Sequence, residues 1–201
     1  NVLSKLEDYL QTEWPELNVF LTSVTDHYAT ASVCGPNAKK IINKIFKDLD
    51  LSDESFPHMS FKEVKLGDIN CRVMRISFTG ELSYEINVEA SYGKYIWEKC
   101  IDAGKEFNIT PYGTETMHLL RAEKGFIIVG QDTDGTMTPV DLQMDWIISK
   151  KKYDFIGKRS LYRSDTIRED RKQLVGLLTD DPNEILEEGA QIVQDENKKP
   201  V

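Results

Sequence analysis

Hydrophobic and polar residues alternate with a helical period in four parts of the chain. The predicted helices cover residues 2–13, a segment that starts at Gly35-Pro36, residues 92–107 and residues 114–124. Proline is favoured in the first turn of a helix, which supports the start of the second segment. Gly125 follows the last segment, and glycine is the residue that most often ends a helix.

Period-two alternation and short apolar runs predict strands in the rest of the chain. The predicted strands cover residues 18–24, 27–34, 61–66, 71–78, 82–88, 126–129, 146–149 and 174–178, with a last hairpin around Gly189 and Val193. Gly67-Asp68 and Thr79-Gly80 are typical turn pairs between successive strands. Because helices are mixed with antiparallel hairpins, the predicted fold class is α+β rather than an alternating parallel α/β fold.

Composition and charge exclude some classes of function. The chain has 34 acidic and 25 basic residues, a net charge of −9. Nucleic acids and anionic membranes do not favour such an acidic protein, so neither is an expected partner, although the net charge leaves a local basic patch open. No apolar run approaches the roughly 20 residues that cross a bilayer. Cys34, Cys71 and Cys100 are scattered and odd in number, which predicts free buried thiols and a reducing, cytoplasmic setting.

Motifs for common catalytic and metal centres are missing from the sequence. The three histidines are far apart, so no metal site is expected. Residues 131–136 begin like a calcium loop but lack its later ligands, and a polar turn in which Asp132 or Asp134 binds backbone amides is favoured. No G-x-S-x-G elbow, G-x-G-x-x-G motif or P-loop occurs, so the chain has no NAD, FAD or ATP motif of its own.

Charged residues lie within apolar runs between residues 78 and 161, where ionised groups are costly unless they are paired or used. We interpret Arg121 and Glu123 as a buried structural pair. Glu85 lies in a strand, on the face opposite its apolar residues. It is either an exposed strand glutamate or a carboxylate that accepts two hydrogen bonds from an N–H-bearing heterocycle. Trp146 is either a core residue or an aromatic wall for a flat ligand.

Four motifs occur in a specific order along the chain. They are an aromatic-T-G-E at 78–81 followed by Glu85, L-R-x-E-x-G at 120–125, D…TP at 132–139, and D-F-I-G-K-x-x-L at 154–161. Together they resemble the aminomethyltransferase family, which comprises the folate-binding T-proteins of glycine cleavage and their relatives. Within the family the chain is similar to the branch found in sarcosine oxidase α subunits. Met117 stands where T-proteins usually have an arginine, and Phe78 replaces their usual tyrosine.

The resemblance implies a fold of two ferredoxin-like α+β lobes with antiparallel sheets and a small β-barrel around a central hole. By this comparison, residues 1–55 finish the first lobe and residues 56–165 form the second. Residues 166–201 begin the barrel, and we expect the sequence to be a fragment of a longer chain.

The resemblance also implies a reaction in which tetrahydrofolate takes up a one-carbon unit and becomes methylene-tetrahydrofolate. An imine formed from sarcosine elsewhere in the complex would deliver that unit. Glu85 would accept hydrogen bonds from the pterin, Phe78 and Trp146 would flank the ring or the benzoyl group, and a polar contact would be lost at Met117. The acid–base aspartate of the family would lie upstream of Asn1, so no catalytic residue is assigned and the fragment alone is expected to be inactive.

The resemblance places the other expected partners and cofactors outside this chain. FAD, FMN and NAD are expected on other domains or subunits of a sarcosine oxidase, whose remaining subunits are the implied protein partners. Two alternatives stay open. One is a glycine-cleavage T-protein or a dimethylglycine-oxidising relative, and the other is a folate-fold module that binds without catalysis. Arg171 and Lys172 could meet the glutamate tail of folate, but a solvated charge cluster is favoured.

Overall fold

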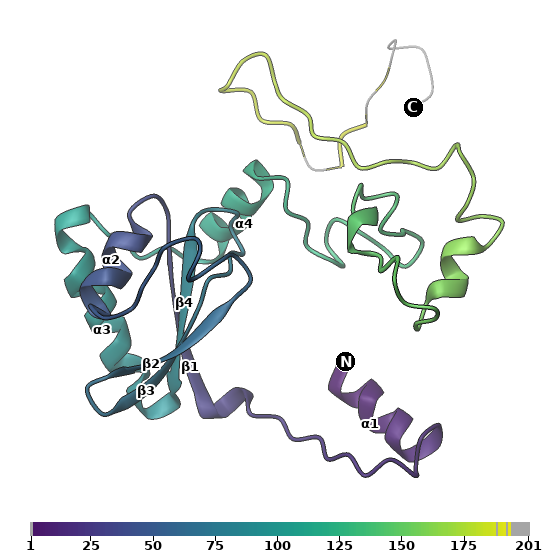
Figure 1. The fold of residues 1–201 in the computed structure, drawn as a ribbon. Helices are drawn as coiled ribbons and strands as arrows, with labels where there is room; N and C mark the ends of the chain where they lie inside the picture. Colours follow the sequence, from purple (N-terminus) through teal and green to yellow (C-terminus); the bar gives the residue numbers. More distant parts are fainter. Residues whose placement is uncertain (1, 188, 192, 194–201) are drawn as a thin grey trace. The chain divides into compact units, whose positions relative to one another are not determined.

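The computed structural model describes residues 2–187, 189–191 and 193. It divides into two compact units, Asn1–Ile127 and Ile128–Val201. The framework of the first unit is a four-stranded antiparallel sheet with the strand order β1-β4-β3-β2 (Figure 1). The strands are β1 (Tyr28–Cys34), β2 (Phe61–Leu66), β3 (Ile69–Met74) and β4 (Ser83–Glu89). The predicted α+β class is therefore confirmed.

All four predicted helical segments form helices. They are α1 (Val2–Thr12), α2 (Ala38–Ile45), α3 (Gly93–Gly104) and α4 (Thr114–Glu123). Short 3-10 turns at Ala90–Tyr92 and Lys105–Phe107 flank α3, so the expected helix over 92–107 is longer than the α-helix itself. Gly125 has a φ of 77° directly after α4. This left-handed conformation is favourable for glycine, which explains why the helix ends there.

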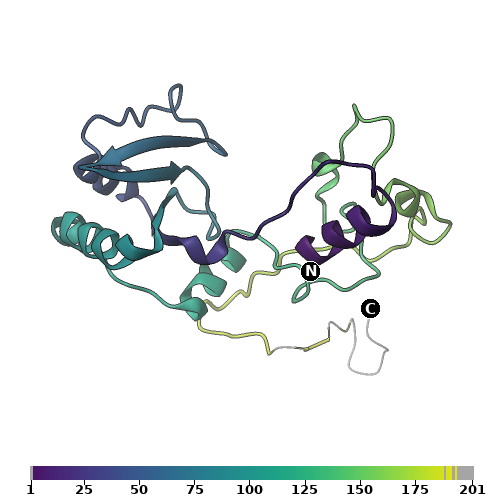
Figure 2. The same cartoon turned by 90° about the horizontal axis from the view of Figure 1, so that it is seen from below.

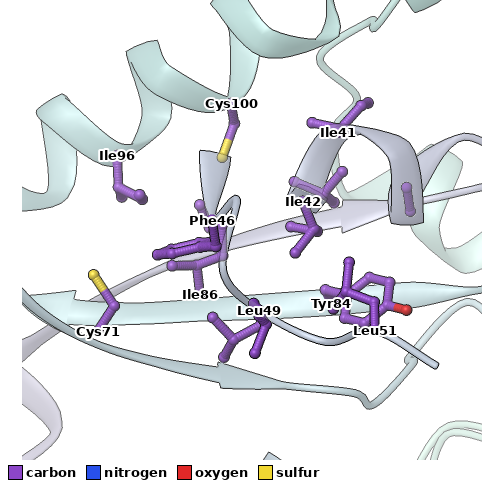
Figure 3. Packing of buried hydrophobic residues seen from close by; sticks show 14 of the residues in the cluster. Ile41, Ile42, Phe46, Leu49, Leu51, Cys71, Tyr84, Ile86, Ile96 and Cys100 are labelled. Atoms are coloured by element: carbon purple, nitrogen blue, oxygen red, sulfur yellow. The ribbon is translucent and has the colours of Figure 1, made fainter. Parts of the chain in front are cut away.

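The core of the first unit lies between one face of the sheet and helices α2 and α3 (Figures 1 and 2). The two helices contact each other, and both pack on β1 and β4. Alternate residues of β4 supply fully buried side chains, because successive strand residues point to opposite faces. Figure 3 shows this packing, which includes Ile42, Phe46, Ile96, Cys100, Tyr84 and Ile86. Burying each large apolar side chain stabilises the fold by about 1.5–3 kcal/mol.

Four of the predicted strands are wrong. Within the described part of the chain, no strand forms at residues 18–24, 126–129, 146–149 or 174–178. Alternation gives a strand only where a neighbouring strand offers backbone partners. Among the described residues, these segments pair with no neighbouring strand, and apolar side chains such as Phe20 and Leu178 are almost fully exposed. The hairpin expected around residues 189–193 includes residues outside the described part.

The second unit has little regular structure among its described residues, which form 3-10 turns at Asp145–Ile147 and Lys158–Tyr162. A backbone hydrogen bond connects two distant parts of it, because the Leu174 N–H donates to the Asp141 carbonyl at 2.8 Å. The boundary expected near residue 55 lies inside the first unit. The division into ferredoxin-like lobes and the start of a barrel stay predictions.

Candidate functional site

Glu85 occupies the centre of the sheet face that points away from the buried core. Its strand, β4, lies between β1 and β3, and its Cα partners are Ser32 and Met74. The side chain is half-buried, and it forms no hydrogen bond or ion pair with any described residue. Burial raises the pKa of the Glu85 carboxyl. A half-buried carboxylate with unused acceptor positions is suited to bind a ligand that carries N–H donors.

A tyrosine and a cysteine lie close to this carboxylate. The hydroxyl of Tyr112 is 3.1 Å from Sγ of Cys34, the last residue of β1. Burial is the main reason why the pKa of Tyr112 is raised, and the hydrogen bond to Cys34 and the charge of Glu85 raise it further. The phenol therefore stays protonated and remains able to donate a hydrogen bond.

A cavity of about 710 Å³ lies beside β1 in the first unit. Its walls come from β1, α2, α3, α4 and the connector 108–112, and they are mainly apolar. Ser32, the cross-strand partner of Glu85, also lines it. The cavity thus reaches the strand position next to the half-buried carboxylate.

The structure brings two of the four predicted binding residues into this region. Met117 lines the cavity, and Glu85 is the cross-strand partner of Ser32, which lines it. Phe78 is 46% exposed in the loop between β3 and β4. Trp146 belongs to the second unit and is 73% exposed, so the alternative of a core tryptophan is wrong.

Sequence reasoning did not find Tyr112, Cys34 or Trp97, which also line the cavity. The only local signal was the position of Cys34, which follows the apolar Val33 and so falls on the polar parity of its strand. Cys34, Cys71 and Cys100 are free thiols. Cys71 and Cys100 are buried as expected, whereas Cys34 is half-buried.

The predicted buried pair of Arg121 and Glu123 is wrong. Arg121 is buried, and its Nη1 donates to the Phe126 carbonyl at 3.1 Å, but Glu123 is exposed. Residues two positions apart project from different sides of a helix, so both side chains cannot enter one buried site.

The favoured interpretation of Arg171 as a solvated charge is also wrong. Its side chain is only 13% exposed, and both oxygens of Asp141 accept hydrogen bonds from it at 2.7 and 2.8 Å. The remaining donors bind Asp165 and the Thr136 carbonyl. All five N–H groups of the guanidinium are therefore occupied, which leaves none for a folate tail. Lys172, by contrast, is exposed.

The Arg171–Asp141 pair predicts a loss of stability in acid. The hydrogen bond from Arg171 is the main cause that lowers the pKa of Asp141 from 3.8 to about 2. Because the folded-state pKa is below the unfolded one, the stabilisation is complete above pH ~4 and is lost as the pH falls towards ~2. Its size is about 2 kcal/mol. Denaturant unfolding at pH 6 and pH 2.5 should show this loss of stability in the wild type. The Asp141→Asn variant should not show it. Equal acid sensitivity of both proteins would contradict the assignment.

The turn at residues 131–136 is polar, as favoured from the sequence. An Asp132 oxygen accepts a hydrogen bond from the Ile128 N–H at 2.7 Å, and an Asp134 oxygen accepts one from the Thr136 N–H at 2.8 Å.

Within the described residues, no three His, Cys, Asp or Glu side chains are grouped as metal ligands. None of the described helices combines the length and the apolar composition that a bilayer crossing requires.

Comparison with known proteins gives consistent matches. Residues 1–152 match the family described as the GCVT N-terminal domain. The chain is 56% identical over 194 residues to "Sarcosine oxidase subunit alpha" of Corynebacterium sp. (strain U-96), covering 96% of this chain and 20% of that protein. It is 42% identical to the protein of the same name from Rhizobium meliloti (strain 1021), with the same coverage. "Aminomethyltransferase" of Thermoanaerobacter sp. (strain X514) is 33% identical, covering 72% of this chain and 39% of that protein. The chain thus spans about a fifth of the length of the sarcosine oxidase subunits that it matches.

Proposed function

Because this chain belongs to the GCVT N-terminal domain family, we propose that it is the tetrahydrofolate-binding region of a sarcosine oxidase α subunit. The identity of 56% to the Corynebacterium subunit, against 33% to an aminomethyltransferase, supports this branch over a free-standing T-protein. Met117, at the position where T-proteins usually have an arginine, supports the same choice. The ferredoxin-like lobes, the FAD, FMN and NAD sites and the other subunits are parts of this proposal that lie beyond the described geometry.

The proposed reaction needs little chemistry from the protein. An imine formed by oxidation of sarcosine elsewhere in the complex would carry the one-carbon unit. Two nitrogens of tetrahydrofolate would bond to its carbon as the C=N bond breaks, and their two protons would pass to the departing amine, which gives methylene-tetrahydrofolate and glycine. The rate depends mainly on holding the pterin in position and on keeping water away from the reactive imine. The residues of this chain would bind and orient the pterin.

The observation that carries the proposal is the half-buried Glu85 carboxylate, which has no hydrogen bond or ion pair among the described residues. Such a group is costly to bury, and a ligand with N–H donors offsets that cost. The amino and ring N–H groups of a pterin supply such donors. Phe78 would flank the ligand and Met117 would give it an apolar contact, whereas the role of Trp146, which belongs to the second unit, stays a prediction from the resemblance.

The proposal is tested by titrating tetrahydrofolate into the full-length protein in a calorimeter, followed by turnover with sarcosine. We expect saturable binding and the appearance of methylene-tetrahydrofolate in the product mixture. Binding without this product would favour the non-catalytic folate module, and the absence of binding would contradict the proposal. Activity with dimethylglycine but not with sarcosine would favour the dimethylglycine-oxidising alternative.

A further inference from the structure

Two motifs that lie far apart in the sequence meet in the first unit of the structure. The aromatic-T-G-E motif lies in the loop 75–82 between β3 and β4, and the L-R-x-E-x-G motif forms the end of α4 and the turn after it. Gly80 of the first motif packs directly against the side chain of Lys124 of the second. The end of α4 therefore supports the loop that carries Phe78.

This contact leaves no room for a side chain at position 80. A Cβ atom there would lie 2.1 Å from Cγ and 2.7 Å from Cβ of Lys124. Non-bonded carbon atoms in contact lie about 3.5–4.0 Å apart, so both distances are collisions. A rotation of the lysine side chain cannot relieve the second one, because the helix backbone fixes Cβ. Gly80 also has a φ of 77°, which glycine adopts without strain.

The end of α4 is held firmly on its own side of the contact. The Lys124 N–H donates to the Leu120 carbonyl at 3.3 Å, and the Phe126 N–H donates to the Arg121 carbonyl at 2.8 Å. The Arg121 side chain is buried, and its Nη1 donates to the Phe126 carbonyl at 3.1 Å. The loop 75–82, all of whose residues the structure describes, contains no helix or strand. A collision between the two would therefore displace the loop rather than the helix.

The position of Phe78 depends on this loop. Its side chain is 46% exposed, so the packing of its own ring does not fix it. The next residue, Thr79, is buried, and its Oγ1 accepts a hydrogen bond from the Glu81 N–H at 3.4 Å. Lys124 and Glu81 form an ion pair, but at 3.9 Å and with both side chains about half exposed it contributes little. The steric fit at Gly80, rather than the ion pair, holds the loop on the helix.

We propose that Gly80 and Lys124 are positioning residues for the ligand. By seating the loop on the end of α4, they hold the ring of Phe78 where it flanks the pterin. This inference rests on the proposed function, in which Phe78 contacts the ligand, and it adds two residues that do not touch the ligand themselves.

The first test compares two glycine substitutions in the full-length protein by calorimetric titration with tetrahydrofolate. Gly80→Ala should weaken binding about three- to tenfold, the effect of losing one aromatic packing contact. Gly67→Ala is the matched control, since Gly67 has a φ of 61° but no atom lies within 4 Å of an added Cβ. Both variants should lose stability in denaturant unfolding because alanine is strained at a positive φ. Only Gly80→Ala should lose affinity.

A second variant removes the support from the other side and does not depend on the folding of Gly80→Ala. Lys124→Gly should weaken binding about threefold, because the loop loses its seat. Lys105→Gly, a substitution of the exposed lysine at the end of α3, should leave the affinity unchanged. In the Lys124→Gly background, Gly80→Ala should change Kd by less than about twofold, since the atoms with which it collides are gone.

A double-mutant cycle with Phe78 tests the route of the effect. In the Phe78→Ala background, Gly80→Ala should change Kd by less than about twofold, because the ring that it displaces is absent. A role in folding alone would lower the stability of Gly80→Ala and leave the Kd of the folded protein unchanged.

Two sets of results separate this inference from the proposed function. Equal Kd values for the wild type, Gly80→Ala and Lys124→Gly would overturn the positioning role and leave the proposed function intact. A loss of affinity in Gly80→Ala that persists in full in the Lys124→Gly or the Phe78→Ala background would do the same. No binding to the wild type would instead overturn the proposed function, and this inference with it.

Discussion

Replacing Glu85 with glutamine should weaken tetrahydrofolate binding about 10- to 100-fold, because charge-assisted hydrogen bonds contribute about 1.5–3 kcal/mol. Glutamine keeps one acceptor oxygen, but its amide N–H₂ group would face the donors of the pterin. The measurement is calorimetric titration of the full-length wild type and of Glu85→Gln. Stability should not fall, because burial raises the pKa of this carboxyl and so already disfavours its ionised form in the folded protein.

Glu89→Gln is the matched control for this experiment. Glu89 lies on the same strand and the same face as Glu85, but it is exposed at the strand end beside Tyr28. Surface substitutions of this kind usually change the free energy of unfolding by less than about 0.5 kcal/mol. Equal affinity of the wild type and Glu85→Gln would remove Glu85 from the site.

Replacing Arg171 with methionine should lower the free energy of unfolding by about 3–5 kcal/mol, since it leaves the buried Asp141 carboxylate without its ion-pair partner and with only the hydrogen bonds from Thr138. Asp141 is almost completely buried, and both of its oxygens bind Arg171. Total stabilities of domains are about 5–15 kcal/mol, so this variant should be severely destabilised. Denaturant unfolding, followed by tryptophan fluorescence and far-UV circular dichroism, measures the change.

Arg168→Met is the control that separates burial from charge. Arg168 also pairs with Asp165 and Asp170, but its side chain is 52% exposed. Exposed pairs contribute about 0–1 kcal/mol, so the variant should retain nearly all of its stability. A second substitution, Asp141→Leu, should restore part of the stability of Arg171→Met because it removes the unpaired charge. Similar losses in Arg168→Met and Arg171→Met would show that the buried pair has no special role.

The parts of the fold that depend on local signals were predictable. The helices α2, α3 and α4 follow from apolar periodicity and from Gly35-Pro36 and Gly125 at their boundaries. The alternation in β4 likewise placed Glu85 on the face opposite the core, and the structure confirms this. The same kind of alternation failed at residues 18–24 and 174–178, because a strand also needs a partner that the local pattern does not specify.

The sequence by itself determined the α+β class, the helices and the family, because periodicity and motif order are properties of short segments. Tertiary structure alone decided which distant side chains meet. Cys34 contacts Tyr112 across 78 positions, and Arg171 binds Asp141 across 30. Neither pair has a local signal, since a contact between distant segments depends on the packing of whole elements and on which groups that packing removes from water.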